Sequence, residues 1–310
     1  MKKFAFVFPG QGSQAIGMLD AFAGNPAVRA TVAEASDALR FDLGALIAAG
    51  PKESLDLTTN TQPVMLTAAV AFYRAWIAAG GAAPAIVAGH SLGEYSALVA
   101  AGVIHFADAV PLVRFRAEAM QQAVPVGQGG MAAILGMADA DVRAVCLLAA
   151  QGDVVEAVNY NAPSQVVIAG HRDAVLRACE LAKEKGAKRA LLLAVSAPFH
   201  SSLLQPASLQ LRTYLETIPF AVPNIPVINN VDVAIVSTPE AMRDALVRQA
   251  ASPVRWVETV QAMAAQDVTH LIECGPGRVL AGLTKRIDAN LVGEAIVEPA
   301  SIDKIMELIK

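Results

Sequence analysis

Residues 89–93 read Gly-His-Ser-Leu-Gly, a G-x-S-x-G sequence that can expose Ser91 as a nucleophile. In this motif the serine occupies a sharp turn between a strand and a helix, and the flanking glycines let the two elements pack closely. The neighbouring sequences supply both elements, since AIVAG is typical of a buried strand and EYSALVAAG of a helix. The backbone amide of Leu92, at the helix start, would face an oxyanion forming on a substrate.

A capping box is the alternative interpretation of the same residues. Ser91 and Glu94 have the spacing at which a serine and a glutamate satisfy free amides at a helix start. This alternative leaves Gly89 and Gly93 unexplained, because glycine disfavours a helix interior. We therefore prefer the nucleophile, and we expect that Glu94 can cap the helix in addition.

A nucleophilic serine needs a general base, and the chain has five histidines. His200 is the best candidate, because SAPFHSS is a loop of small residues directly after a predicted strand and can reach a cleft. No acidic residue stands in an obvious loop between Ser91 and His200, so a backbone carbonyl is expected to orient the histidine. The other four histidines are expected to point away from the nucleophile or to lie in turns and strands: His90, His105, His171 and His270.

The composition indicates a globular protein. Of 310 residues, 55% are hydrophobic and 17% charged, which provides a core for one large domain or a domain with an insert. No apolar stretch approaches the roughly 18 to 20 residues of a membrane-spanning helix, and the net charge of −4 argues against a general nucleic-acid binder. Three widely spaced cysteines predict reduced thiols. We expect a soluble cytoplasmic protein with no metal and no redox cofactor.

Alternating strand and helix patterns predict a parallel sheet with helices on both faces. Strands are expected at KFAFVF, AIVAG, IPVINNV and THLIECG. One helix should open at Asn25-Pro26, where asparagine caps and proline takes the first position, and another should cover residues 62–80. Residues 126–197 differ, because they read as βαββαβ, the ferredoxin-like pattern. We expect them to form a small subdomain inserted in a core of residues 1–125 and 198–310.

The sequence GQGSQA, residues 10–15, matches a relaxed dinucleotide-binding fingerprint after a predicted strand. Its context does not fit, because Gly24-Asn25-Pro26 ends any long helix and no second strand follows at the required distance. We interpret the segment as a glycine-rich loop at the carboxyl end of a strand, where open α/β sheets place their sites.

Taken together, five segments resemble the malonyl-CoA:acyl-carrier-protein transacylase family over essentially the whole chain. These are FPGQGSQ, GHSLGEYSAL, SAPFHS, NNVD and ECGPG. The resemblance implies an α/β-hydrolase-like core with a ferredoxin-like subdomain, with Ser91 as nucleophile and His200 as base. It also implies an oxyanion hole formed by the backbone amides of Gln11 and Leu92, and a histidine oriented by the main-chain carbonyl of Gln249.

The family also places an arginine where it can hold the malonyl carboxylate. The segment VRFRAEAMQ offers Arg114 and Arg116, which diverge by about 200° on a helix, so only one can face the cleft. The family spacing R-x-x-x-M-Q selects Arg116. For Arg114 we expect a surface pairing with Glu118 or Asp108.

The activity implied by the resemblance is malonyl transfer from malonyl-CoA to acyl carrier protein for fatty acid synthesis, without a metal. Alternatives are a serine hydrolase, an inactive subunit that binds carrier protein, and the same chemistry in polyketide assembly or a malonate decarboxylase. A basic cluster is a candidate docking surface for the acidic carrier protein, although it also fits a solvated helix end: Lys183, Lys185, Lys188 and Arg189.

Overall fold

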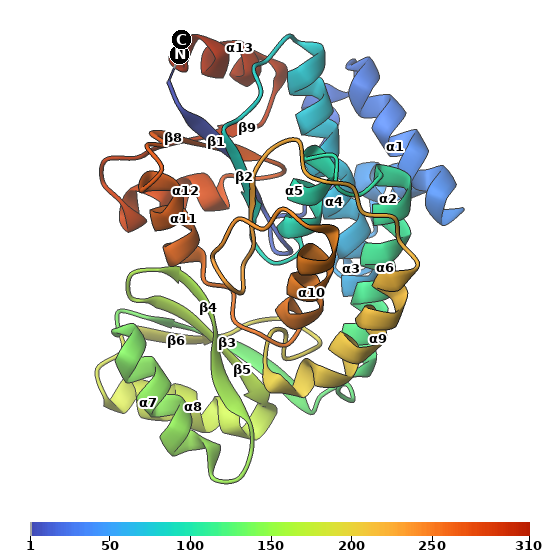
Figure 1. Cartoon of the computed structure of the whole chain (residues 1–310). Coiled ribbons are helices and arrows are strands. Elements are labelled where there is room, and N and C mark those ends of the chain that lie inside the picture. The colour runs from blue at the N-terminus through green and yellow to red at the C-terminus, as the bar shows by residue number, and fades with distance from the viewer. Residues whose placement is uncertain (1) are drawn as a thin grey trace.

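A computed structural model describes residues 2–310, which form one parallel and one antiparallel sheet (Figure 1). The parallel sheet has the order β7-β2-β1-β8-β9, and every neighbouring pair in it is parallel. This arrangement confirms the predicted α/β class. Its strands are β1 (Phe4–Phe8), β2 (Ile86–Gly89), β7 (Val227–Ile228), β8 (His270–Cys274) and β9 (Val292–Ile296).

The central strand β1 is buried on both faces, as its continuous apolar sequence FAFVF requires. Its phenylalanines point into one core, shared with helices on one face of the sheet. Ala5 and Val7 point into a second core on the other face. The helices of the first core are α1 (Pro26–Leu39), α2 (Leu43–Ala49), α3 (Lys52–Leu55), α4 (Thr58–Ala78), α5 (Gly93–Ala100), α6 (Phe106–Gln122), α9 (Gln205–Glu216), α10 (Pro239–Gln249) and α13 (Pro299–Leu308).

The second core is covered by α11 (Trp256–Ala264) and α12 (Val279–Ile287). Two short 3₁₀ helices, Asp20–Phe22 and Ser202–Leu204, complete this part of the chain. None of the helices within residues 2–310 is long and apolar enough to cross a membrane.

Two helix starts test the sequence predictions. At α1 the side chain of Asn25 accepts from the amide of Ala27, with Pro26 at the first position, so that prediction is confirmed. The start predicted for α4 was wrong, because the helix begins at Thr58 and contains Pro63. Proline has no amide hydrogen to give the carbonyl four residues earlier. That carbonyl belongs to Thr59 and accepts instead from Arg114 Nη1, at 2.8 Å.

The antiparallel sheet and its two helices form a compact unit, which we call the antiparallel unit (Figure 1). Its strand order is β4-β5-β3-β6 with all neighbours antiparallel, so the predicted βαββαβ pattern is confirmed. The unit has a hydrophobic core of its own. Its elements are β3 (Gly129–Leu135), α7 (Asp139–Ala150), β4 (Val155–Ala162), β5 (Gln165–His171), α8 (Arg172–Glu184) and β6 (Arg189–Leu192).

The antiparallel unit joins the rest of the molecule through its chain connections and through contacts of β4. The chain enters and leaves it at touching residues, because a Cβ on Gly129 would lie 2.5 Å from Cδ of Pro198. In addition, β4 hydrogen-bonds with Val254, whose carbonyl accepts from the amide of Tyr160 at 3.0 Å. The unit is therefore held against the end of the parallel sheet.

Candidate active site

Ser91 lies in a strained turn directly after β2. Its φ is +54°, in the left-handed region that side chains other than glycine rarely adopt. A Cβ on Gly89 would lie 1.8 Å from the carbonyl carbon of Gly93, and one on Gly93 would lie 2.0 Å from the carbonyl oxygen of Phe8. Only glycine fits at these two positions, so β1, β2 and α5 can approach closely enough to form the turn.

The serine hydroxyl contacts a histidine that is held in one tautomer. Oγ of Ser91 lies 2.6 Å from Nε2 of His200, and Nδ1 of His200 lies 2.9 Å from the main-chain carbonyl oxygen of Gln249. A carbonyl only accepts, so Nδ1 carries the hydrogen and Nε2 presents its lone pair to the serine. His200 is 3% exposed. Burial and the nearby charge of Arg116 lower the pKa of His200 to about 3, so the ring is neutral near pH 7.

Of the two candidate arginines, only Arg116 faces the serine. Its Nη2 lies 3.3 Å from Ser91 Oγ and 2.9 Å from Gln249 Oε1, while its Nη1 donates to Gln62 Oε1 at 2.7 Å. Arg114, about 200° from Arg116 around α6, contacts α4 and lies 3.3 Å from Glu118. The structure thus gives Arg114 the pairing with Glu118 that the sequence suggested.

These side chains surround a cavity of about 120 Å³ between the two sheets. Gln11 and Leu92 also line it, and within residues 2–310 neither backbone amide donates to a protein acceptor. Both amides are thus available to an oxygen placed in the cavity. The apolar part of the lining comes largely from the antiparallel unit and the segment after it: Met131, Leu193, Val195 and Phe199.

The expected cap by Glu94 is absent, which corrects the sequence interpretation. The amides of Gly93 and Glu94 already donate to the carbonyls of His90 and Ser91, at 2.9 and 3.0 Å, so the helix start needs no side chain. Glu94 instead turns inward. Its Oε2 accepts from the amide of Asn230 at 3.0 Å and from Nε2 of Gln249 at 2.9 Å.

Asn230 is a site residue to which the sequence interpretation gave no role. Its Oδ1 accepts from the amide of Ser91, and its Nδ2 donates to the carbonyl of Gly89, both at 2.7 Å. It thereby holds the turn on both sides of the serine. The available signal was its position, since polar residues directly after a strand often line α/β sites.

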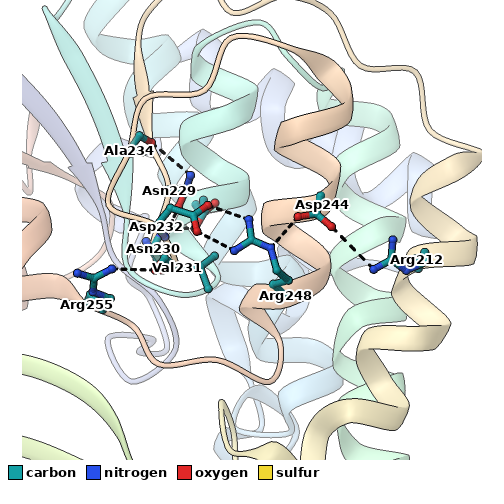
Figure 2. A network of polar contacts seen from close by, with 10 residues as sticks. Arg212, Asn229, Asn230, Val231, Asp232, Ala234, Asp244, Arg248 and Arg255 are labelled. Carbon is teal, nitrogen blue, oxygen red and sulfur yellow. Dashed lines mark hydrogen bonds and ion pairs between the residues drawn. The ribbon is translucent and has the colours of Figure 1, made fainter.

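The loop that carries Asn230 is fixed by ion pairs (Figure 2). Arg248, at the end of α10, donates to both carboxylate oxygens of Asp232 at 2.7 and 2.8 Å and to Asp244 at 2.7 Å. Arg255 donates to the carbonyl of Val231 at 3.1 Å. Since Gln249 follows Arg248 directly, this network holds Asn230 and Gln249 in one arrangement.

His90 also lines the cavity, but its Nε2 is directed to Oδ1 of Asn161 in β4, at 2.8 Å. Its ring packs against Trp256 with centroids 5.6 Å apart. Neither contact involves Ser91. His90 thus connects the parallel sheet to the antiparallel unit, and His200 is the histidine in contact with the serine.

A serine–histidine pair with free amides, at the carboxyl end of a parallel sheet, defines the class of α/β enzymes that form acyl-serine intermediates. A family model described as an acyl transferase domain matches residues 5–292. The malonyl CoA-acyl carrier protein transacylase of Escherichia coli is 56% identical over 309 residues, covering 99% of this chain and 100% of that protein. The chain therefore belongs to the acyl transferase family, and within it to the malonyl CoA-acyl carrier protein transacylases.

Solved structures agree with this family. The acyl-carrier-protein S-malonyltransferase from Burkholderia pseudomallei is 69% identical, with a TM-score of 0.97, and the match covers 98% of this chain and 99% of that one. A malonyl-transacylase solved in complex with a type II PKS acyl-carrier protein is 52% identical, with a TM-score of 0.98, and covers 99% and 100%.

Proposed function

We propose that this chain transfers a malonyl group from malonyl-CoA to the phosphopantetheine thiol of acyl carrier protein, through a malonyl-Ser91 intermediate. The choice of malonyl as the acyl group is supported by the position of Arg116. Arg116 is buried and lies 3.3 Å from Ser91 Oγ, and among residues 2–310 its hydrogen bonds go only to neutral oxygens. A guanidinium placed in this way can receive a carboxylate at the far end of the acyl chain.

In the first step, Oγ of Ser91 attacks the thioester carbonyl and gives its proton to Nε2 of His200. The carbonyl of Gln249 keeps the imidazole in the required tautomer and stabilises the imidazolium. The amides of Gln11 and Leu92 hold the oxyanion of the tetrahedral intermediate. When this intermediate collapses, the carbon–sulfur bond breaks, and coenzyme A leaves with the proton from His200.

The second step reverses the first with a different thiol. His200 takes the proton of the phosphopantetheine thiol, and the sulfur attacks the carbonyl of malonyl-Ser91. The carbon–oxygen bond breaks, and Ser91 Oγ recovers its proton from His200. Arg116 would hold the carboxylate in both steps, so that the reacting carbonyl stays at the same place relative to Ser91.

A serine hydrolase remains the rival from another reaction class, since it would share Ser91 and His200. Mass spectrometry after brief exposure to malonyl-CoA separates the two. A transferase should accumulate a malonyl adduct on Ser91 that disappears when holo-acyl carrier protein is added, and the carrier protein should gain the same mass. Free malonate released at the same rate with and without carrier protein would contradict the proposal.

We further propose that the reaction serves fatty acid synthesis and takes place in the cytoplasm. We assign the reaction to fatty acid synthesis, supported by the relatives named as malonyl CoA-acyl carrier protein transacylases. The relative solved with a type II PKS carrier protein keeps polyketide assembly as the alternative acceptor. The cytoplasm fits a reaction that uses coenzyme A, and the three cysteines are free thiols.

We also propose the domain division expected from the sequence, with residues 126–197 inserted between residues 1–125 and 198–310. Its support is that all four strands of the antiparallel sheet lie between residues 129 and 192. The core of the antiparallel unit is likewise built from this segment.

A further inference from the structure

Arg116 is a buried cation with no carboxylate in contact. Its side chain is 2% exposed, and within residues 2–310 it takes part in no ion pair. Its guanidinium is held by neutral oxygens of Gln62, Gln249 and Ser91. Because these oxygens are neutral, the positive charge of the guanidinium stays available to a substrate. Their positions determine where the guanidinium lies.

The side-chain amide of Gln249 is one of these partners, and its two ends are not equivalent. Its Oε1 accepts from Arg116 at 2.9 Å, while its Nε2 donates to the carbonyl of Ser91 and to Glu94, both at 2.9 Å. If the amide turned over, its two N–H donors would face the N–H donors of the guanidinium. The correct orientation therefore requires an acceptor on the side away from Arg116.

Two acceptors lie on that side, the main-chain carbonyl of Ser91 and the side chain of Glu94 in the first turn of α5. Glu94 is 2% exposed, and its Oε2 lies between two donors, Nε2 of Gln249 and the amide of Asn230. Burial raises the pKa of Glu94 to about 7, and the hydrogen bonds from Gln249 and Asn230 oppose the rise. Oε2 can accept in both protonation states, because a proton on Oε1 leaves the other oxygen free.

We propose that Glu94 is a positioning residue, which keeps the oxygen of the Gln249 amide toward Arg116 and so places the guanidinium for the acyl carboxylate. This inference rests on the proposed malonyl transfer. It assigns to the side chain of Gln249 a task separate from that of its main-chain carbonyl, which contacts His200. The two tasks can be separated experimentally, because a side-chain substitution leaves the carbonyl in place.

The chain offers a matched control for the loss of a buried carboxylate. Glu273 in β8 is 0% exposed, and burial raises its pKa to about 7 as well. Its Oε2 accepts from the amide of Ala281 at 2.9 Å, and it has no hydrogen bond to Arg116 or Gln249. Substitutions of Glu273 thus test burial and charge without the contact to the amide.

The experiment compares acylation of Ser91 by malonyl-CoA and by acetyl-CoA, which lacks the carboxylate. The measured quantity is the ratio of the two kcat/KM values, with thermal unfolding of each variant as the check on folding. Glu94→Met and Gln249→Met should each lower this ratio by about tenfold or more, as expected when a charge-assisted hydrogen bond is lost. Glu94→Gln, Glu273→Gln and Glu273→Met should change it by less than about threefold.

The double variant of Glu94→Met with Gln249→Met should lower the ratio no further than either change alone, because both act through one amide. Equal losses for both thioesters in Glu94→Met would overturn the positioning role. The positioning role would also be overturned if Glu94→Gln lowered the ratio as much as Gln249→Met does. That result would assign the effect to the charge of Glu94.

If Glu94→Met does not fold, Gln249→Met and Glu94→Gln decide the question. An unchanged ratio in Gln249→Met then overturns the role of the amide. The preference of the wild type for malonyl-CoA over acetyl-CoA distinguishes a failure of the positioning role from a failure of the proposed function. A wild type without preference for malonyl-CoA overturns malonyl transfer itself, whereas a preference kept by Gln249→Met overturns only the positioning role.

Discussion

The parallel-sheet part and the antiparallel unit differ in what they bury. At the end of the parallel sheet, Glu94, Arg116, His200, Asn230 and Gln249 are each at most 3% exposed. Within residues 129–192, by contrast, the buried side chains are all apolar. Burying a polar group costs free energy unless its hydrogen bonds are replaced. The molecule therefore buries polar side chains at the candidate active site and only apolar ones in the unit that supplies one wall of the cavity.

The two parts should therefore respond differently to substitution. Changes in the buried polar group should alter the chemical step or the choice of acyl group. Changes in the antiparallel unit should instead alter how a large substrate is bound. The following predictions test this division, beginning with the largest effect.

Ser91→Ala should remove the malonyl adduct and lower turnover by a factor on the order of 10³ or more, because no other hydroxyl of residues 2–310 contacts His200 Nε2. Ser96→Ala, in the same helix, is the matched control. Its hydroxyl is buried and has no hydrogen-bond partner in the described part of the chain, residues 2–310, so the adduct should persist. Intact protein mass after exposure to malonyl-CoA checks both variants, and a stable adduct on Ser91→Ala would refute the assignment.

Arg116→Ala should lower kcat/KM for malonyl-CoA by the equivalent of roughly 3 to 5 kcal/mol, the range for truncated buried charge pairs. Acetyl-CoA should be affected much less, because it presents no carboxylate. Arg114→Ala serves as the control in the same helix and should lower the unfolding temperature without changing the preference. Equal losses for malonyl and acetyl transfer in Arg116→Ala would make Arg116 a structural residue.

The pH dependence of acylation tests the environment of His200. Burial, Arg116 and His90 all lower its pKa, to about 3. The base is therefore neutral above that pH, and kcat/KM should fall less than about threefold between pH 7 and pH 5. An ordinary histidine with a pKa near 6.5 would lose about 25-fold over the same range. A steep loss near pH 6, in protein that circular dichroism shows to be folded, would contradict this prediction.

Arg248→Met removes the guanidinium that binds both carboxylate oxygens of Asp232 and so holds the loop of Asn230 (Figure 2). Because Arg248 is 40% exposed, the free energy of unfolding should fall by only about 1 kcal/mol. Malonyl and acetyl transfer should decrease together by a few-fold, since the side chain of Asn230 holds the turn of Ser91, which reacts with both thioesters. Chemical denaturation and the two kcat/KM values measure these effects, and a loss confined to malonyl-CoA would show that the loop acts on Arg116.

The smallest effect is expected on the antiparallel unit. Lys183, Lys185, Lys188 and Arg189 are all exposed. The double change Lys183→Glu and Lys185→Glu should raise KM for carrier protein by a few-fold, weaken its salt dependence, and leave KM for malonyl-CoA unchanged. The control reverses Lys304 and Lys310, at the opposite end of the molecule near α13 (Figure 1). Equal changes for both substrates would remove this surface as the docking site.

Local patterns in the sequence predicted most of the fold. The apolar run of β1, the cap at Asn25 and the βαββαβ order each depend on residues close together in the chain, and each is found in the structure. The start of α4 was missed because the carbonyl that Pro63 leaves without an amide partner is satisfied by Arg114, 55 residues away in the chain.

Contacts between residues far apart in the chain also limit how much of the site can be predicted from the sequence. The motif around Ser91 and the small-residue loop of His200 indicated two residues that the structure brings into contact. The inward direction of Glu94 depends on Asn230 and Gln249, which are 136 and 155 residues away. A local pattern that fits a helix cap contains no information about such distant partners.

The contact between Gly129 and Pro198 leads us to expect that the antiparallel unit can be exchanged as a module. Since its two ends already touch, a much shorter connection could span the same two points at little entropic cost. We expect that excision of residues 130–197 with a short bridge would leave a protein that still folds around the parallel sheet. A unit of different length could be inserted at this junction. Such an insertion offers a route to acyltransferases that keep Ser91 as nucleophile and accept other carrier proteins.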